Sequence, residues 1–229
     1  WGGSDTPPVH VAPDGVDLER FTPALSATEA RRRLGLPVDR QIVLYAGHLY
    51  RWKGVETLAR AAALLPASAQ VVIVGRTPAD RTRFAAWLRR EGLAERVHRA
   101  GYVPPTQVPA YLAASDVLVL PNSGSVPIAH TYTSPLKLFE YMAAERPIVA
   151  SDLPALREVL DHDKTAWLVP ADAPPALAAG IAAILQDPTR GRRLAAAAAM
   201  VVRRYTWDER AARVLNWTQE LAARSNRHA

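Results

Sequence analysis

Short apolar segments rich in β-branched residues alternate with longer helix-like segments along most of this chain, and this alternation restricts the fold more than any other feature. The segments typical of strands are QIVLYAG (41–47), QVVIVG (70–75), RVHRAGYV (96–103), DVLVLP (116–121), RPIVAS (146–151) and TAWLVP (165–170). Their nearly continuous apolar character is typical of a parallel sheet that is covered on both faces. The sequence therefore predicts an α/β fold with a doubly wound parallel sheet of about six strands and helices on both faces.

Helix-like segments fill the intervals between these strands. They span 54–65, 79–92, 107–114, 135–144, 153–160 and 174–187, and two further helices are expected over 187–205 and 206–225. Thr206 is a good N-cap for the last of them. In sheets of this type ligands bind beyond the carboxyl ends of the strands, so we expect the chemistry in the loops that follow the strands.

The composition is typical of a soluble globular protein with acidic partners. The 229 residues include 28 Lys and Arg against 22 Asp and Glu, which gives a net charge of +6. Such a charge favours phosphates, nucleic acid or an anionic lipid surface. No basic run interleaves with aromatic residues, which argues against nucleic acid. No apolar run is long enough to span a membrane. Cysteine is absent, which excludes disulfides and thiol chemistry and fits a cytoplasmic location.

The stretch SPLKLFEYM (134–142) places a cation in the first turn of a predicted helix, where the helix dipole repels it. Ser134 can cap this helix, and the free backbone N–H groups of Leu136 and Lys137 would form an anion site at its N-terminus. A bound phosphate would remove the conflict, and Glu140, about 9 Å along the axis from Ser134, would suit a pair of ribose hydroxyls. The alternative is a solvated i,i+3 pair between Lys137 and Glu140.

A second lysine occupies an equally unfavourable position. In AGHLYRWKGVETL, Gly47 follows a predicted strand, and Lys53 and Gly54 stand where the next helix begins. The chain has only three lysines, and two of them therefore lie at helix N-termini on the same edge of the predicted sheet. We interpret this pair as a site for one polyanion, such as a diphosphate.

Other candidates at strand ends carry a weaker signal. His48 follows Gly47, and Arg76 follows Gly75, but a turn histidine and a solvated loop arginine are the ordinary interpretations. The segment DHD (161–163) matches the D-x-D spacing with which some sugar-transfer enzymes hold a divalent metal. It precedes a strand and so lies on the wrong edge of the sheet, which indicates a surface loop, and we expect no metal site.

Five segments taken together resemble one family. In order, VAPDGVDLERF, YAGHLYRWKGVETL, AGYVPPTQVPAYLAASDVLVLPN, SPLKLFEYMAAERPIVASDLPALREVL and TAWLVPADAPPALAAGI are similar to the C-terminal half of GT-B-fold glycosyltransferases, family 4 in particular. The similarity runs from about Val11 to the end of the chain. In that family this half is a Rossmann-like domain that binds a nucleotide-diphosphate sugar. The resemblance implies sugar transfer to an unknown acceptor, with retention, without a metal and without any cofactor besides the donor substrate.

The resemblance also implies a role for each matching residue. Lys53 would hold the donor diphosphate and Glu140 the ribose, and these two are the expected catalytic residues. The backbone at Tyr102 and Val103 would hold the base. The other positions expected to contact the donor are Gly47, His48, Arg51, Gly75, Arg76, Tyr132, Ser134, Leu136 and Lys137, the last two through their amides.

Some positions depart from the family pattern. His48 stands near a place where arginine is common, and the nearby Arg51 can substitute for it. Tyr132, eight residues before Glu140, stands where the family often has an acid that touches the donor sugar. The SPLK form of the motif looks like a recognised variant. Glu145 occupies a position where glycine is common.

The resemblance divides the chain into three parts. Residues 1–16 are expected to be a linker or boundary segment, 17–205 the nucleotide-sugar-binding domain, and 206–229 a C-terminal helix. Family members also have an N-terminal, acceptor-binding domain of similar size, and no such sequence is present here. We therefore expect the chain alone to bind the donor without transferring sugar.

The expected partners are a nucleotide sugar and the missing N-terminal domain, and no nucleic acid. The expected location is cytoplasmic. A basic protein with lipid-linked acceptors can also associate peripherally with a membrane surface. Two alternatives remain open: a non-catalytic nucleotide-binding or scaffold module of the same fold, and another GT-B-type enzyme such as a sugar-nucleotide epimerase, which would need its own acid and base carboxylates.

Overall fold

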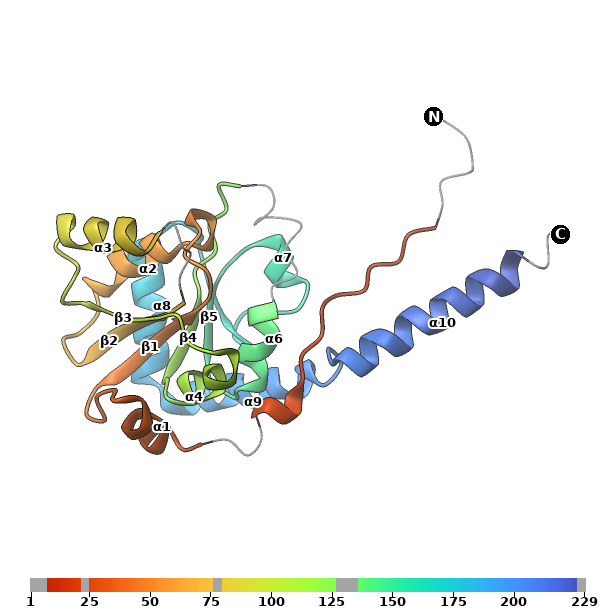
Figure 1. The fold of residues 1–229 in the computed structure, drawn as a ribbon, viewed down its shortest axis with the longest axis horizontal. Coiled ribbons are helices and arrows are strands. Elements are labelled where there is room, and N and C mark those ends of the chain that lie inside the picture. The colour runs from red at the N-terminus through yellow and green to blue at the C-terminus, as the bar shows by residue number, and fades with distance from the viewer. Residues whose placement is uncertain (1–7, 22–24, 76–79, 127–135, 226–229) are drawn as a thin grey trace.

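The computed structural model describes residues 8–21, 25–75, 80–126 and 136–225, and a single parallel sheet lies at its centre (Figure 1). The six strands are hydrogen-bonded in the order β3-β2-β1-β4-β5-β6, and every neighbouring pair is parallel. The strands are β1 (Gln41–Ala46), β2 (Ala69–Val74), β3 (Val97–Gly101), β4 (Val117–Leu120), β5 (Ile148–Ser151) and β6 (Trp167–Val169). The predicted parallel sheet of six strands is confirmed.

Helices cover both faces of the sheet, as predicted. On β1, Ile42 and Leu44 share a core with α1, α4, α6, α7 and α9, whereas Val43 and Tyr45 share a core with α2, α3 and α8. The helices are α1 (Ala27–Leu34), α2 (Val55–Ala62), α3 (Asp80–Arg90), α4 (Val108–Ala113), α6 (Leu136–Ala143), α7 (Pro154–Arg157), α8 (Pro174–Gln186), α9 (Pro188–Val202) and α10 (Trp207–Ser225), with 3-10 turns η1 (Leu18–Phe21), η2 (Arg51–Lys53) and η3 (Pro105–Gln107).

The strand order reverses direction between β1 and β4. The chain adds β2 and β3 on one side of β1, and it then returns to add β4, β5 and β6 on the other side. The loops that leave the carboxyl ends of β1 and β4 therefore diverge toward opposite faces of the sheet. In doubly wound sheets this position is where ligands bind.

Two elements at the start of the domain were not predicted. Helix α1 has a clear cap at each end: the Ser26 side chain accepts the Glu29 N–H, and Gly35 adopts the left-handed conformation with φ 64. η1 precedes α1. One predicted helix, over 153–160, is shorter in the structure than expected. Helix α7 ends at Arg157, and the chain continues in turns to Leu160.

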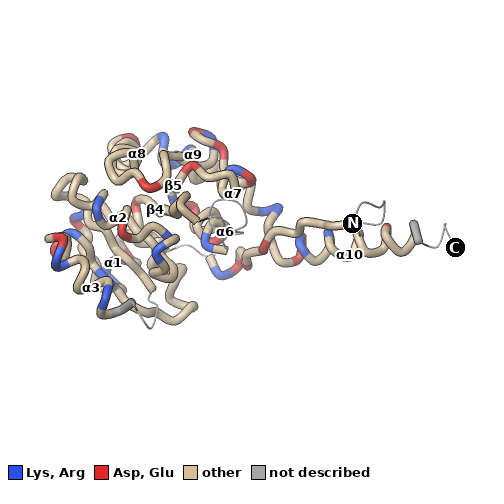
Figure 2. The backbone as a smooth tube through the Cα atoms, turned by 90° about the horizontal axis from the view of Figure 1, so that it is seen from above, with Lys and Arg blue, Asp and Glu red and all other residues tan. Residues whose placement is uncertain are grey.

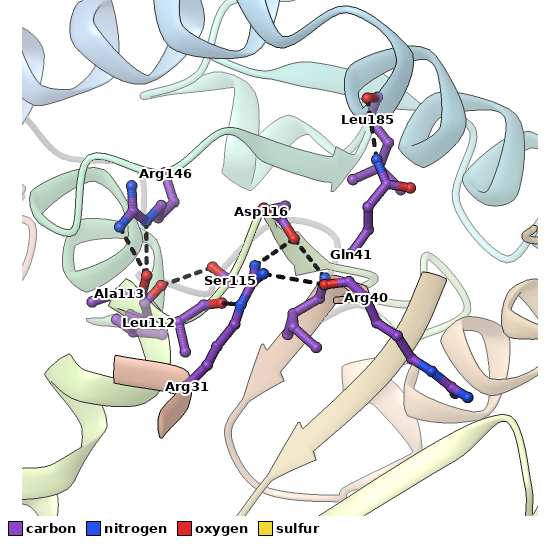
Figure 3. Close-up of polar contacts among 11 residues, drawn as sticks. Arg31, Arg40, Gln41, Leu112, Ala113, Ser115, Asp116, Arg146 and Leu185 are labelled. Carbon is purple, nitrogen blue, oxygen red and sulfur yellow. Dashed lines mark hydrogen bonds and ion pairs between the residues drawn. The ribbon is translucent and has the colours of Figure 1, made fainter. Parts of the chain in front are cut away.

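The amino edge of the sheet is held by what we call the amino-edge network, formed by Arg31, Arg40, Ile42, Ala114 and Asp116. Figure 3 labels Arg31, Arg40 and Asp116 of this network. From α1, Arg31 donates to Ala114 O at 2.8 Å, to Arg40 O at 3.1 Å and to Asp116 Oδ2 at 2.6 Å. The same Asp116 oxygen accepts the Ile42 N–H at 2.6 Å. The network thus joins α1 to the beginnings of β1 and β4.

Residues 8–16 and α10 extend away from the sheet side by side (Figures 1 and 2). The Val16 N–H donates to Tyr205 O at 2.8 Å, and farther out the His10 ring stacks on Trp217 at 5.4 Å. Thr206 caps α10, as predicted, by accepting the Glu209 N–H at 3.1 Å. No helix in the described part of the chain is both long enough and apolar enough to cross a membrane.

Candidate functional site

The loops that follow β1 and β4 are joined directly to each other. The Ser123 N–H donates to Trp52 O at 2.9 Å. Gly54 has φ 71, and a Cβ on it would lie 1.6 Å from Pro121 O. Only glycine fits both this backbone conformation and this close approach. The contact fixes η2, which carries Lys53, against the chain that leaves β4.

Lys53 is a half-buried cation without an anionic partner in the described part of the chain. Its Nζ lies 3.9 Å from the centre of the Trp52 ring, a contact that attracts a cation weakly. Burial, and in addition the positive charge of Lys137, lower the pKa of Lys53 from 10.5 to about 8. The two lysines of the predicted diphosphate site therefore lie close enough to repel each other.

Helix α6 brings Lys137 and Glu140 to the same place. Lys137 Nζ donates to Glu140 Oε2 at 2.7 Å, so the i,i+3 pair considered as the alternative does form. It is not a solvated pair, because the Glu140 side chain is only 15% exposed. On the next residue, the Tyr141 hydroxyl accepts the Ala46 N–H at 2.7 Å and donates to Ala46 O at 3.3 Å. This bond ties α6 to the carboxyl end of β1.

Three glycines leave bare backbone at the ends of β1, β2 and β3. The Gly47 N–H donates to Val74 O at 2.9 Å, and the Gly75 N–H donates to Gly101 O at 2.7 Å. Gly75 has φ 119, and a Cβ there would lie 2.0 Å from Gly47 O. A large group can therefore approach the backbone at this edge without meeting side chains from these positions.

The remaining predicted residues of the loop after β1 are exposed. The His48 carbonyl accepts the Tyr45 hydroxyl at 2.6 Å, and the His48 ring stacks on Tyr50 at 5.3 Å. Arg51 begins η2, and its carbonyl accepts the Gly54 N–H at 3.0 Å. The structure thus places His48 and Arg51 in the loop that carries Lys53, at the same edge of the sheet.

The chain after β3 forms another side of the site. Tyr102 is 61% exposed, and Val103 packs partly against the core. The next turn, η3, is held by Arg20, a residue that no sequence pattern predicted. Arg20, in η1, donates from Nη2 to Pro105 O at 3.0 Å, and its Nη1 lies 4.0 Å from Glu140 Oε1. No local pattern marks Arg20, because its contacts are far away in the sequence.

Some predicted residues lie outside this arrangement. Arg76, Tyr132 and Ser134 lie outside the described residues, whereas Leu136 begins α6 and is 45% exposed. The D-x-D segment lies in the loop that leads into β6, where Asp163 accepts a hydrogen bond from Arg193 at 2.7 Å. This loop is at the amino edge, so its interpretation as a surface loop is confirmed.

The arrangement has the chemistry of a site for a polyanion beside a hydroxyl pair. Two ammonium groups and the N-terminal end of α6 can neutralise phosphate oxygens. The Glu140 carboxylate, about one turn along α6, can accept hydrogen bonds from hydroxyls. Arg20 links that carboxylate to the chain after β3, because it contacts both Glu140 and Pro105.

Comparisons with known proteins show the family of this chain. Residues 40–187 match the family described as glycosyl transferases group 1. A D-inositol 3-phosphate glycosyltransferase from Xylanimonas cellulosilytica is 34% identical over 222 residues, which cover 93% of this chain and 52% of that protein. The chain thus spans about half the length of the curated relatives that it matches.

Solved structures share the fold. A sucrose-phosphate synthase from Thermosynechococcus elongatus superposes with a TM-score of 0.81 at 31% identity, over 93% of this chain and 53% of that one. Anabaena HepE, solved in complex with UDP, superposes with a TM-score of 0.78 at 20% identity, over 90% of this chain and 56% of that one. At 20% identity, the similarity to Anabaena HepE shows a shared fold only.

Proposed function

The chain belongs to the family of group 1 glycosyl transferases, and we propose that it is the donor-binding half of such an enzyme. In this proposal it holds a nucleotide-diphosphate sugar at the carboxyl edge of the sheet. The observation that carries the proposal is that Lys53 of η2 has no anionic partner among the described residues, while Lys137 of α6 lies close enough for its charge to add to the effect of burial in lowering the pKa of Lys53. The UDP bound by the structurally similar Anabaena HepE supports it.

The proposed binding mode uses the groups already described. The diphosphate lies between Lys53 and Lys137, at the N-terminal end of α6. Lys137 then turns from Glu140 to the phosphate oxygens, and the Glu140 carboxylate accepts the ribose hydroxyls. The base lies against the backbone of Tyr102 and Val103. In this binding mode the phosphate oxygens accept hydrogen bonds from the two lysines, and the Glu140 carboxylate accepts them from the ribose hydroxyls. Each charged group therefore has a partner.

These groups would also promote the reaction of the complete enzyme. As the bond between the sugar and the diphosphate breaks, its electron pair stays with the departing phosphate oxygen, and negative charge grows there. Lys53, Lys137 and the α6 dipole would stabilise this charge in a partly buried site. We propose that transfer proceeds with retention to an acceptor held by another half, and that this chain alone transfers no sugar.

Calorimetric titration with UDP, GDP and ADP tests the donor site. We expect one of these nucleotides to bind, and Lys53→Met and Lys137→Met each to weaken it by about 10-fold to 100-fold, as expected for the loss of a charged hydrogen bond. The third lysine provides the matched control, because Lys164 lies at the amino edge with a side chain 75% exposed. Lys164→Met should bind as the unaltered chain does.

The same titrations can also contradict the proposal. Equal binding by the unaltered chain and both site variants would refute the proposed diphosphate site. Failure of all three nucleotides to bind would refute donor binding by this chain. Incubation with the UDP-, GDP- and ADP-glucose forms tests the other half of the proposal, and release of a glycosylated product by this chain alone would contradict it.

A further inference from the structure

We propose that Arg20 is a positioning residue, which holds the Glu140 carboxylate and the loop after β3 at the separation that a ribonucleoside requires. The inference rests on the proposed function, because it concerns the same nucleotide. Arg20 lies in η1, before the first strand, so it is not one of the residues that follow strand ends.

The guanidinium of Arg20 contacts two different elements. Nη2 donates to Pro105 O in η3 at 3.0 Å, and Nη1 lies 4.0 Å from Glu140 Oε1 on α6. Pro105 and Glu140 are 35 residues apart in the sequence, and η3 directly follows the loop that is proposed to hold the base, whereas α6 carries the carboxylate proposed to hold the ribose. Because the guanidinium is a planar, rigid fork, one side chain can set the distance between them.

Glu140 lies between two cations that contact different oxygens. Lys137 bonds Oε2 at 2.7 Å, and Arg20 is on the side of Oε1. In the proposed complex Lys137 turns to the diphosphate, so Arg20 is the cation that stays beside the carboxylate. Arg20 would keep the Glu140 side chain from following the Lys137 side chain toward the diphosphate. The carboxylate would then still face the ribose.

The backbone that carries Arg20 is held in place. The next residue, Phe21, is buried with 8% exposure. Four residues earlier, the Val16 N–H donates to Tyr205 O at 2.8 Å, and the Tyr205 ring stacks on Phe139 of α6 at 4.8 Å. The segment therefore packs on the same helix that carries Glu140, so the contact of Arg20 with Glu140 is set by the fold.

The contacts of Arg20 contribute little to folding, which makes the inference testable. Its side chain is 39% exposed, and ion pairs of such exposure add little to stability. Arg20→Met should therefore leave the urea midpoint of unfolding nearly unchanged. A residue with a merely structural role would not alter the preference of the site for ribose.

The experiment compares each of UDP, GDP and ADP with its 2′-deoxy form by calorimetric titration. The unaltered chain should bind the ribonucleotide more tightly. Arg20→Met should lower this preference by about 10-fold, mainly by weakening the binding of the ribonucleotide. Arg20→Lys should retain part of the preference. In a Glu140→Gln background, which already lacks the preference, Arg20→Met should cause no further loss.

The matched control is another arginine near Arg20. Arg33 pairs with Glu29 within α1 and is 61% exposed, and Arg33→Met should keep the full preference for ribose. An unchanged preference in Arg20→Met would overturn the inference alone. An equal loss for both sugar forms would also overturn it, because Arg20 would then act on the phosphates. Failure of the unaltered chain to bind any of the nucleotides would overturn the proposed function and this inference with it.

Discussion

The two edges of the sheet both gather arginine, lysine and carboxylate side chains, but they complete their hydrogen bonds differently. At the amino edge, Arg31 has an acceptor for Nε, Nη1 and Nη2, and its side chain is 8% exposed. At the carboxyl edge, Lys53 has no anionic partner among the described residues, and the nearby Lys137 repels it. One edge is closed by the chain itself, and the other is open to an anion.

The difference separates cations that hold the fold from cations that await a ligand. A buried charge is costly unless it is paired, and three nitrogens of the Arg31 guanidinium each donate to an acceptor. Lys53 is left in the costly state, and burial together with the charge of Lys137 lowers its pKa. In proteins such a perturbed group at a ligand-binding position is a candidate functional residue. Substitutions at each edge test whether the two edges differ in this way.

The largest effect is expected at the amino edge. Arg31→Met should lower the free energy of unfolding by about 3 kcal/mol, because it removes the cation paired with the Asp116 carboxylate and the side-chain donor of two carbonyls. Urea denaturation followed by circular dichroism measures it. The nucleotide affinity of the folded fraction should stay unchanged, since the network is at the opposite edge from the proposed site.

Arg33→Met is the control for this prediction, because Arg33 is on the same helix and its pair with Glu29 is exposed. It should change the free energy of unfolding by less than about 0.5 kcal/mol. Equal effects of the two variants would contradict the view that the amino edge is a closed structural network.

The same contrast explains which parts of the fold could be predicted. The strands were predicted within a few residues, because β1 is buried on both faces from Ile42 to Ala46 and so has an unbroken apolar pattern. Helix α1 was missed because the two residues that it buries are Ala30 and Arg31, and a charged residue at a buried position hides the apolar face. The cap formed by Ser26 and Glu29 was the available signal.

The candidate site was predictable only in part. The meeting of Lys53 and Lys137 follows from a general property of parallel sheets, whose strands all end at one edge. The contact of Arg20 with Glu140 and Pro105 depends instead on how the N-terminal segment packs on α6, and no local spacing encodes that. Local patterns therefore predicted residues at strand ends and missed one that is brought there by packing.

A smaller effect concerns pH. Because the pKa of Lys53 is about 8 in the free chain and a bound anion raises it, nucleotide binding must be accompanied by proton uptake above that pH. The affinity should be flat below about pH 8 and fall by up to about tenfold per pH unit above it. Titrations in buffers of different ionisation enthalpy at about pH 7 and about pH 9 measure both the affinity and the proton uptake.

Lys53→Arg separates this cause from others. The guanidinium stays protonated throughout this range, so the variant should show neither the fall in affinity nor the proton uptake. Parallel pH profiles for the unaltered chain and Lys53→Arg would mean that another group titrates, and that Lys53 does not bind the anion.

The smallest effect is on stability, and its sign distinguishes the two edges. The pKa of Lys53 is lower in the folded chain than the ordinary 10.5, so the charged lysine favours the unfolded state. This cost is fully present below about pH 8 and disappears as the pH rises toward 10.5. Without nucleotide at about pH 7, Lys53→Met should therefore raise the free energy of unfolding by about 1 kcal/mol, after allowance for solvent screening.

Urea denaturation with and without nucleotide completes this test. Without nucleotide Lys53→Met should be the more stable protein at about pH 7, and the difference should shrink toward about pH 10. With saturating nucleotide the order should reverse, because the ligand stabilises the chain that binds it more tightly. Lys164→Met should show neither effect, since that side chain is 75% exposed. A loss of stability in nucleotide-free Lys53→Met would place Lys53 with the cations that hold the fold, as at the amino edge.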